Sequence, residues 1–287
     1  MCIRDRSAKQ GMNLGGTLSS DQASVTLQAD AAINVSGTVH AGTQLNVSDL
    51  QGGGTQDLNN TGTLLADGAL TIQARDVSNS GDAGLQGSGG TRITAQSLTN
   101  SATLVMSTLA TADGQLNLGA LTNTGTIQSA RDLSMSVLTR VTNRGDLLAG
   151  RDLTLQAASS DQTLRLEADE DSVLQAGRNL SLGSTTRRIL IAQHDGAAIS
   201  TSALNVFATA LSNAGYLQSN GAVDVTSTGS LSNSGSVIAG GNLSLLADTL
   251  TNSGELQSEA GMTLSASTLN NSGLINAAQG DALQTIN

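Results

Sequence analysis

Apolar and small polar residues alternate along most of this chain. In one stretch Leu133, Met135 and Val137 alternate with Ser134 and Ser136. A period of two places every second side chain on one face of a β-strand. No window has the i, i+3, i+4 apolar spacing of a helix long enough to connect such strands in βαβ units. The pattern therefore predicts short strands, each with one buried face.

The alternation recurs about every twenty residues. Residues 121–157 read LTNTGTIQSARDLSMSVLTR and then VTNRGDLLAGRDLTLQA, so that Leu121 corresponds to Val141 and Asn123 to Asn143. The recurring kernel is an apolar residue, any residue, Asn, any residue and usually Gly. Its asparagines are Asn60, Asn79, Asn100, Asn123, Asn143, Asn213, Asn233, Asn252 and Asn271. Apolar alternation continues through the one long gap between them, and we count roughly thirteen units.

A repeat of this length restricts the architecture. A four-stranded propeller blade needs about 40 residues, which is twice the period found here. We therefore expect an all-β fold, a parallel β-helix or β-solenoid with two or three short strands in each coil of about 20 residues. It should form a single body over residues 12–287. Residues 1–11 contain the opening MCIRDRS and match neither the repeat nor a secretory signal, so we expect a leader without native structure.

The repeated Asn and Gly have a physical role in such a coil. Each coil turns a corner at the same place, and a corner residue often needs a positive φ, which Gly adopts freely and Asn tolerates. Stacked asparagines can also donate and accept hydrogen bonds from one coil to the next. We interpret both sets as structural turn residues without a ligand. The glycines are Gly62, Gly81, Gly125, Gly145, Gly215, Gly235, Gly254 and Gly273.

Composition narrows the function further. The chain has no Pro or Trp, one Phe and one Tyr, which predicts a narrow core of stacked aliphatic side chains. Its 13 basic and 23 acidic residues give a net charge of −10, and the scattered arginines form no basic stripe. We therefore expect no nucleic-acid partner. No apolar run is long enough for a transmembrane helix.

Several consecutive units carry a family resemblance. LTNTGTIQSARDL, VTNRGDLLAGRDLTLQA, LSNSGSVIAGGNLSLLA and LTNSGELQSEAGMTLSA resemble the repeats of filamentous haemagglutinin and related two-partner secretion exoproteins, including the stalks of contact-dependent growth-inhibition toxins. The resemblance covers the chain from about residue 12.

This resemblance implies a right-handed β-helix and export through an outer-membrane partner transporter to the bacterial cell surface or the medium. It also implies a role as an adhesin, or as the rod that displays an adhesin or effector to a host or neighbouring-cell receptor. No segment resembles the family's amino-terminal secretion domain or a carboxy-terminal toxin. Both ends stop within a unit, so we expect a fragment of a longer virulence protein.

The most irregular and most charged stretch is residues 158–198. Insertions in a solenoid form loops on one face, and such loops can bind. An alternative function is therefore a binding module that contacts a receptor or glycan through these loops. The candidate contact residues are Asp169, Glu170, Asp171, Arg187, Arg188 and His194.

Other chemistry finds less support in the sequence. A calcium site at residues 169–171 lacks the usual spacing of oxygen ligands. A β-helix polysaccharide lyase or hydrolase is a third possibility, but only His194 stands beside an acid, Asp195, and the motifs of pectin-degrading enzymes are absent. We expect no enzyme activity, no catalytic residues, no metal and no cofactor. Arg144–Asp146 is an integrin-like tripeptide of weak specificity, and Phe207 and Tyr216 are too few to form an aromatic sugar platform.

Overall fold

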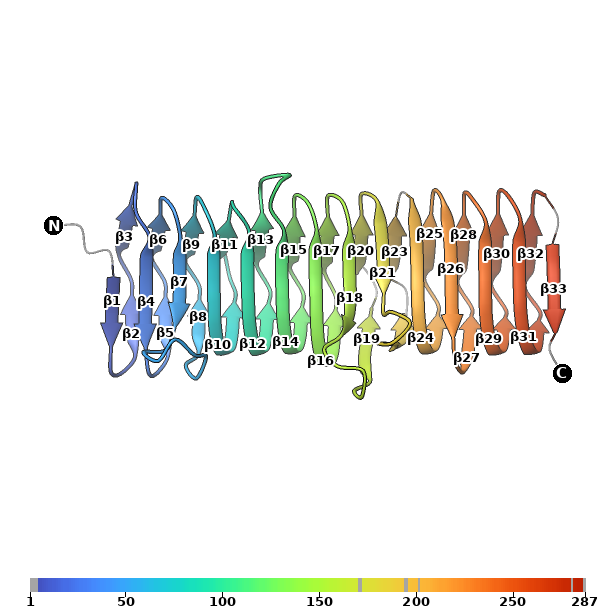
Figure 1. Cartoon of the computed structure of the whole chain (residues 1–287), viewed down its shortest axis with the longest axis horizontal. Coiled ribbons are helices and arrows are strands. Elements are labelled where there is room, and N and C mark those ends of the chain that lie inside the picture. Colours follow the sequence, from blue (N-terminus) through green and yellow to red (C-terminus); the bar gives the residue numbers. More distant parts are fainter. Residues whose placement is uncertain (1–4, 170–171, 194–195, 201, 280, 286–287) are drawn as a thin grey trace. The chain divides into compact units, whose positions relative to one another are not determined.

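The computed structural model describes residues 5–169, 172–193, 196–200, 202–279 and 281–285. Every regular element in these ranges is a β-strand (Figure 1). The chain divides into two units: residues 1–137 with 148–150 form unit 1, and residues 138–147 with 151–287 form unit 2.

Fifteen strands lie entirely in unit 1. They are β1 (Asp5–Ala8), β2 (Met12–Leu14), β3 (Thr17–Ser20), β4 (Val25–Ala29), β5 (Ile33–Val35), β6 (Thr38–Ala41), β7 (Leu45–Ser48), β8 (Leu58–Asn60), β9 (Thr63–Ala66), β10 (Leu70–Asn79), β11 (Gly84–Gly87), β12 (Thr91–Asn100), β13 (Thr103–Ser107), β14 (Gly114–Asn123) and β15 (Thr126–Ser129). The division between the units falls within β16 (Leu133–Asn143) and β17 (Asp146–Ala149).

The remaining strands belong to unit 2. They are β18 (Leu153–Ala157), β19 (Leu164–Ala168), β20 (Val173–Ala176), β21 (Asn179–Leu182), β22 (Ile189–Gln193), β23 (Ala197–Ser200), β24 (Ala203–Asn213), β25 (Tyr216–Ser219), β26 (Ala222–Ser227), β27 (Ser230–Asn233), β28 (Ser236–Ala239), β29 (Leu243–Asn252), β30 (Glu255–Ser258), β31 (Met262–Asn271), β32 (Leu274–Ala277) and β33 (Asp281–Thr285).

Each strand pairs in parallel with its equivalent one turn further along the chain. In unit 1, β10 pairs with β12 over nine positions at an offset of 21 residues, from Leu70 with Thr91 to Asn79 with Asn100. In unit 2, β29 pairs with β31 over nine positions at an offset of 19, from Leu243 with Met262 to Asn252 with Asn271. The long strands replace two short strands of other turns, since β24 pairs with both β26 and β27.

The sequence period is thus the turn of a parallel β-solenoid. One strand of each turn belongs to the series β3, β6, β9, β11, β13, β15, β17, β20, β23, β25, β28, β30 and β32, which gives thirteen turns in the described residues. The predicted fold class, the number of units and the period of about 20 residues are confirmed. β1 begins at Asp5, within the expected leader, and pairs with β4; residues 1–4, including Cys2, lie outside the described residues.

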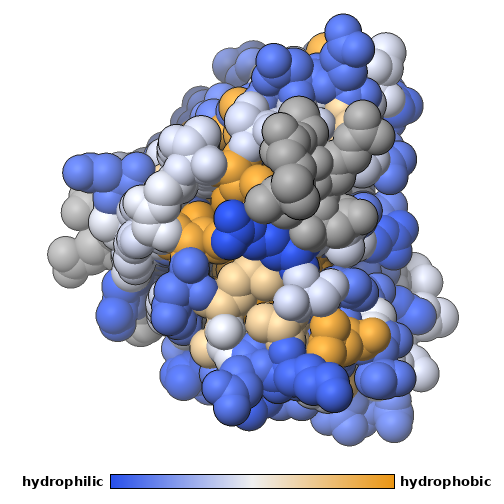
Figure 2. Space-filling model, turned by 90° about the vertical axis from the view of Figure 1, so that its left-hand side faces the viewer, coloured by the Kyte–Doolittle hydropathy of each residue, from blue (hydrophilic) through white to orange (hydrophobic). Residues whose placement is uncertain are grey.

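Aliphatic columns form the core of each unit. Leu27, Val47, Ile72, Ile93 and Leu116 occupy equivalent positions on successive turns of unit 1, and each is at most 1% exposed. Seen from one end, the unit has hydrophobic side chains at its centre and mostly hydrophilic ones at its rim (Figure 2). Both aromatic residues lie outside the fully buried set: Phe207 is half-buried, and Tyr216 is 54% exposed. The predicted narrow aliphatic core is confirmed.

The reason given for the repeated glycines is wrong at five positions. Gly81 has a φ of 74°, as expected. The φ is not positive at five other repeat glycines, which are Gly62, Gly125, Gly235, Gly254 and Gly273. A Cβ added at any of the five would collide with the carbonyl oxygen of the turn below, for example that of Gly235 beneath Gly254. These positions therefore require Gly because the backbones of stacked turns approach too closely for any side chain.

Candidate functional site

The kernel asparagines form hydrogen-bonded columns inside both units. In unit 1 the Nδ2 of Asn60 donates to the Oδ1 of Asn79, Asn79 donates to Asn100, and Asn100 donates to Asn123, each at 2.8 Å. In unit 2 Asn213, Asn233, Asn252 and Asn271 form the same ladder, with spacings of 2.7 to 2.8 Å. Such a ladder satisfies polar groups that would otherwise be costly to bury.

These asparagines belong to the core. Asn60, Asn79, Asn100, Asn123, Asn143 and Asn252 are 0% exposed, whereas Asn271 is exposed. The second amide proton is also used: Asn79 donates to the Thr103 carbonyl at 3.2 Å, and Asn233 donates to that of Glu255 at 3.1 Å. Sequence reasoning placed them at a corner and did not predict their complete burial.

The ladder is interrupted where the turns become irregular. Ala168 occupies the equivalent position one turn after Asn143, and Gln193 occupies it one turn later, immediately before Asn213. The Gln193 amide donates instead to the carbonyls of Gly196, at 2.6 Å, and Tyr216, at 2.8 Å. As a result, the Oδ1 of Asn213 is buried without a hydrogen-bond partner.

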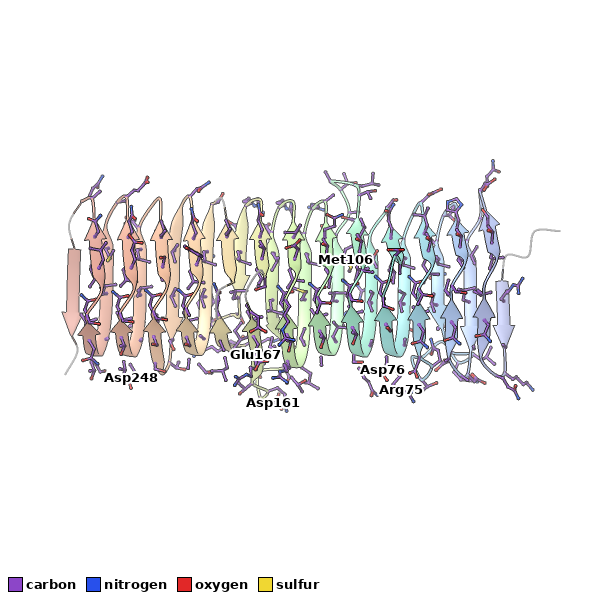
Figure 3. All side chains as sticks on the ribbon, turned by 180° about the vertical axis from the view of Figure 1, so that it is seen from behind. Arg75, Asp76, Met106, Asp161, Glu167 and Asp248 are labelled. Atoms are coloured by element: carbon purple, nitrogen blue, oxygen red, sulfur yellow. The ribbon has the colours of Figure 1, made fainter. Side chains whose placement is uncertain are left out.

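Ion pairs gather on the irregular turns. Glu167 on β19 accepts hydrogen bonds from the Nε of Arg140, at 2.9 Å, and from the Nε of Arg165, at 2.6 Å. Its side chain is 17% exposed and lies at the edge of unit 2 (Figure 3). The hydrogen bond from Arg140, reinforced by that from Arg165, lowers the pKa of Glu167 to about 2, against the opposing effect of partial burial. This carboxylate is therefore held as a structural anion.

Two further pairs connect successive turns of unit 2. Arg178 binds both carboxylate oxygens of Asp152, which also accepts hydrogen bonds from the backbone and side-chain nitrogens of Asn179. The hydrogen bond from Arg178 is the main cause that lowers the pKa of Asp152. Arg144 of the integrin-like tripeptide binds Asp169 at 2.6 Å, so its guanidinium is already engaged.

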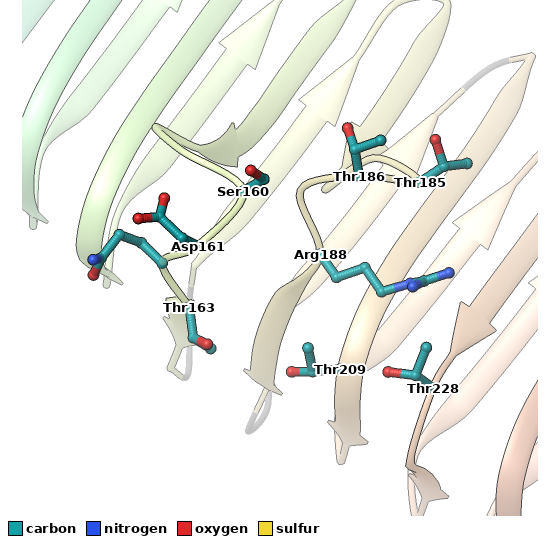
Figure 4. A pocket seen from close by; sticks show the side chains of 9 residues that line it. Ser160, Asp161, Thr163, Thr185, Thr186, Arg188, Thr209 and Thr228 are labelled. Atoms are coloured by element: carbon teal, nitrogen blue, oxygen red, sulfur yellow. The ribbon is translucent and has the colours of Figure 1, made fainter.

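A polar hollow of about 230 Å³ opens on unit 2 between two long loops. Residues 158–163 connect β18 to β19, and residues 183–188 connect β21 to β22. Figure 4 shows the Arg188 side chain extending from the second loop past Thr209 and Thr228, with Asp161 on the other side of the hollow. Hydroxyl groups, one guanidinium and one carboxylate thus line a single small space.

The second loop is fixed by its own backbone. The amide of Ser184 donates to the carbonyl of Arg187 at 3.0 Å, and the amide of Arg187 donates to the carbonyl of Ser184 at 3.2 Å. Gly183 has a φ of 78°, and a Cβ there would also collide with the carbonyl of Phe207. Position 183 is therefore specific to Gly, and the turn sets the position of Arg188, the last residue before β22.

The predicted contact residues separate into four groups. Asp169 is paired with Arg144, and Arg188 lines the hollow. Arg187 closes the loop through its backbone. Glu170, Asp171 and His194 lie outside the described residues.

Sequence reasoning missed Thr209 and Thr228, which lie beyond residue 198. The signal that could have found them is the turn period, because Thr228 follows Thr209 by 19 residues, and the positions before them, Ala208 and Ser227, align with Ile189 directly after the second loop.

Sequence reasoning also missed a loop built around Asp49, between β7 and β8. Its carboxylate accepts hydrogen bonds from the amides of Gln51 (2.9 Å), Gly53 (2.7 Å) and Thr55 (3.2 Å), and from the Thr55 hydroxyl (2.8 Å). The Thr55 hydroxyl is the main cause that lowers the pKa of Asp49. The Gly-rich stretch QGGGT after this Asp was the available signal.

Within the described ranges, no three His, Cys, Asp or Glu side chains gather as a metal site would need. In the same ranges, no helix has the length and apolarity required to cross a membrane.

Comparisons with known proteins identify the repeat. The family model described as Haemagglutinin repeat matches residues 7–49, 25–120, 109–257 and 246–284. The chain is 29% identical to Toxin CdiA of Escherichia coli over 81% of its own length and 9% of the relative's. It is 34% identical to Deoxyribonuclease CdiA of Dickeya dadantii (strain 3937) over 69% of its length and 6% of the relative's.

A tRNA nuclease CdiA of Escherichia coli O6:K15:H31 is 29% identical over 66% of the chain and 7% of the relative. The chain thus spans less than a tenth of the length of these relatives. No solved structure matches it.

Proposed function

The chain belongs to the haemagglutinin-repeat family, and on this premise we propose that it is a structural stalk segment of a large bacterial exoprotein. The observation that supports this role is the turn-on-turn stacking within each unit, in which aliphatic and asparagine columns occupy the interior. A solenoid exposes a large surface relative to its number of residues, and each added turn contributes stability through its contacts with the neighbouring turn.

We propose that the stalk serves adhesion or the display of an effector at the cell surface, after export through an outer-membrane partner transporter. The support comes from the CdiA relatives, of which the chain matches only 6 to 9%. The toxin and nuclease activities in their names belong, in this proposal, to other parts of those proteins. The segment itself carries no catalytic role.

Whole-turn deletion tests the stalk role. Removing residues 61–100 joins Asn60 to Ser101 and deletes two complete periods, so that the ladder and strand register continue. The longer protein that carries this segment should then be exported normally and keep its activity toward target cells. The matched control removes residues 61–89, which is not a whole number of periods, and should reduce export.

The two deletions give opposite results under the proposal. If the whole-turn deletion abolishes cell contact while export continues, residues 61–100 contain a binding function and are not a simple stalk. If the out-of-register deletion is tolerated equally well, regular stacking is not what the protein requires of this segment.

A further inference from the structure

The polar hollow of unit 2 is lined by an arginine, Arg188, that forms no ion pair within the described residues. Arg140, Arg144, Arg165 and Arg178 each pair with a carboxylate on the same or a neighbouring turn. Arg188 has no carboxylate within ion-pair distance among the described residues, and its Nε is buried without a hydrogen-bond partner. A half-buried guanidinium of this kind favours a bound anion, because burial has removed part of its hydration.

The position of the guanidinium suits a ligand. Arg188 follows directly on the hydrogen-bonded Ser184–Arg187 turn, and its side chain runs past Thr209 and Thr228 along the hollow (Figure 4). Because Nε is buried, a carboxylate held by Arg188 would bind through the two terminal amino groups. Charge-assisted pairs of this geometry are among the stronger polar contacts.

The rest of the lining restricts the anion. Thr209 and Thr228 come from successive turns, and Ser160 and Thr163 come from the loop opposite, so that hydroxyl groups face the space from two sides. Asp161 lines the same space, and a hydrogen bond from Ser159 keeps the pKa of its carboxyl low, so that it is ionised at neutral pH. One positive and one negative group suit a monoanion better than a dianion such as phosphate.

From this geometry we propose that the hollow binds the carboxylate of a hydroxylated acid, a sugar acid of the uronate type, with Arg188 holding the carboxylate and Asp161 and the threonines accepting and donating hydrogen bonds to its hydroxyls. A volume of about 230 Å³ lies below the roughly 300 Å³ at which drug-sized pockets begin, and suits a single sugar unit. The proposed site goes beyond the stalk role and does not depend on it.

Calorimetric or NMR titration of the full chain with methyl galacturonide tests the site. We expect saturable binding with a Kd on the order of 1 mM, since few contacts are available. Methyl galactoside lacks the carboxylate and acetate lacks the hydroxyls, so each should bind at least about tenfold more weakly. Polygalacturonate tests whether the terminus of an acidic polysaccharide serves as well as the free unit.

Variants of the chain assign the binding to named groups. Arg188→Ala should weaken binding at least about tenfold, whereas Arg92→Ala, which removes an exposed arginine from unit 1, should leave it unchanged. Thr209→Val and Thr228→Val keep the shape of the side chain and should each weaken binding a few-fold. These two variants keep the test decisive if Arg188→Ala fails to fold.

Four outcomes would overturn the proposal: no saturation at tens of millimolar ligand, equal binding of the galactoside, equal binding of acetate, or equal binding by the Arg188→Ala variant.

Discussion

At the scale of the single residue, the buried amides are the most demanding feature. Asn233 accepts a hydrogen bond from Asn213, at 2.7 Å, and donates one to Asn252, at 2.8 Å, inside an aliphatic core. Loss of the Asn233 amide would leave the Nδ2 of Asn213 and the Oδ1 of Asn252 without these partners. A buried polar group without a partner costs about 1 to 3 kcal/mol.

Asn233→Ala should therefore lower the free energy of unfolding by about 2 kcal/mol or more, measured by urea denaturation followed by circular dichroism. Asn270→Ala is the matched control, because Asn270 is exposed and next to the last asparagine of the column. Its effect should stay within about 0.5 kcal/mol. Equal losses for the two variants would mean that the column contributes no special stability.

The repeat glycines provide a second test at this scale. Gly254→Ala should cost about 1 to 3 kcal/mol, because the new methyl group would collide with the carbonyl of Gly235. Gly261→Ala should be nearly neutral, since its nearest neighbour is the flexible side chain of Asn242, 3.5 Å away. Thermal unfolding of both variants measures the difference, and a well-tolerated Gly254→Ala would refute the close-approach explanation.

Sequence alone predicted which residues recur, but not why these ones do. The period identified Asn233 and Gly254 as equivalent to Asn252 and Gly273. A repeated Asn can, however, lie either at a turn or in the core. Likewise, only the stacking of the turns shows whether a repeated Gly is needed for a positive φ or for a close backbone contact. The same limit hid Thr209 and Thr228, which line one hollow with Arg188 only when the turns stack.

At the scale of the element, strand existence followed directly from alternation, and the irregular turns did not. Ala168 and Gln193 stand where the regular turns place Asn, and this stretch depends on ion pairs around β19 in addition to side-chain packing. Insertion length and charge density identified residues 158–198 as unusual. They could not show that Arg188 forms no ion pair with a carboxylate of the described residues.

The Glu167 cluster makes stability depend on pH. Because the pKa of Glu167 falls from 4.5 to about 2 on folding, its contribution is complete above about pH 5 and disappears as the pH falls from about 4.5 to about 2. Glu167→Gln should lose on the order of 1 kcal/mol at neutral pH, given the exposed arginines. The difference from the unmodified chain should vanish near pH 2, as checked by urea denaturation across this range. If the difference persists at that pH, the packing of the Glu167 side chain, and not its charge, accounts for the lost stability.

At the scale of the molecule, parallel turns predict additive stability. Removing residues 234–252 joins Asn233 to Ser253 and deletes one turn of unit 2 in register. The shortened chain should fold with unchanged circular dichroism per residue and a urea m-value reduced roughly by the share of one turn. Removing residues 234–243 instead shifts every later strand against its neighbour and should prevent folding of the strands that follow. Similar m-values for the two variants would contradict the turn as the unit of stability.

The six asparagine pairs described above all face the same way, each Nδ2 donating to the Oδ1 of the next turn. A single reversed amide would place two oxygens against each other on one side and two NH₂ groups against each other on the other. It would also break the hydrogen bonds that Asn79 and Asn233 donate to the backbone carbonyls of Thr103 and Glu255. The columns are therefore small one-dimensional dipolar arrays with a single permitted sense. Any turn inserted into such an array has to arrive with its asparagine turned in that same sense.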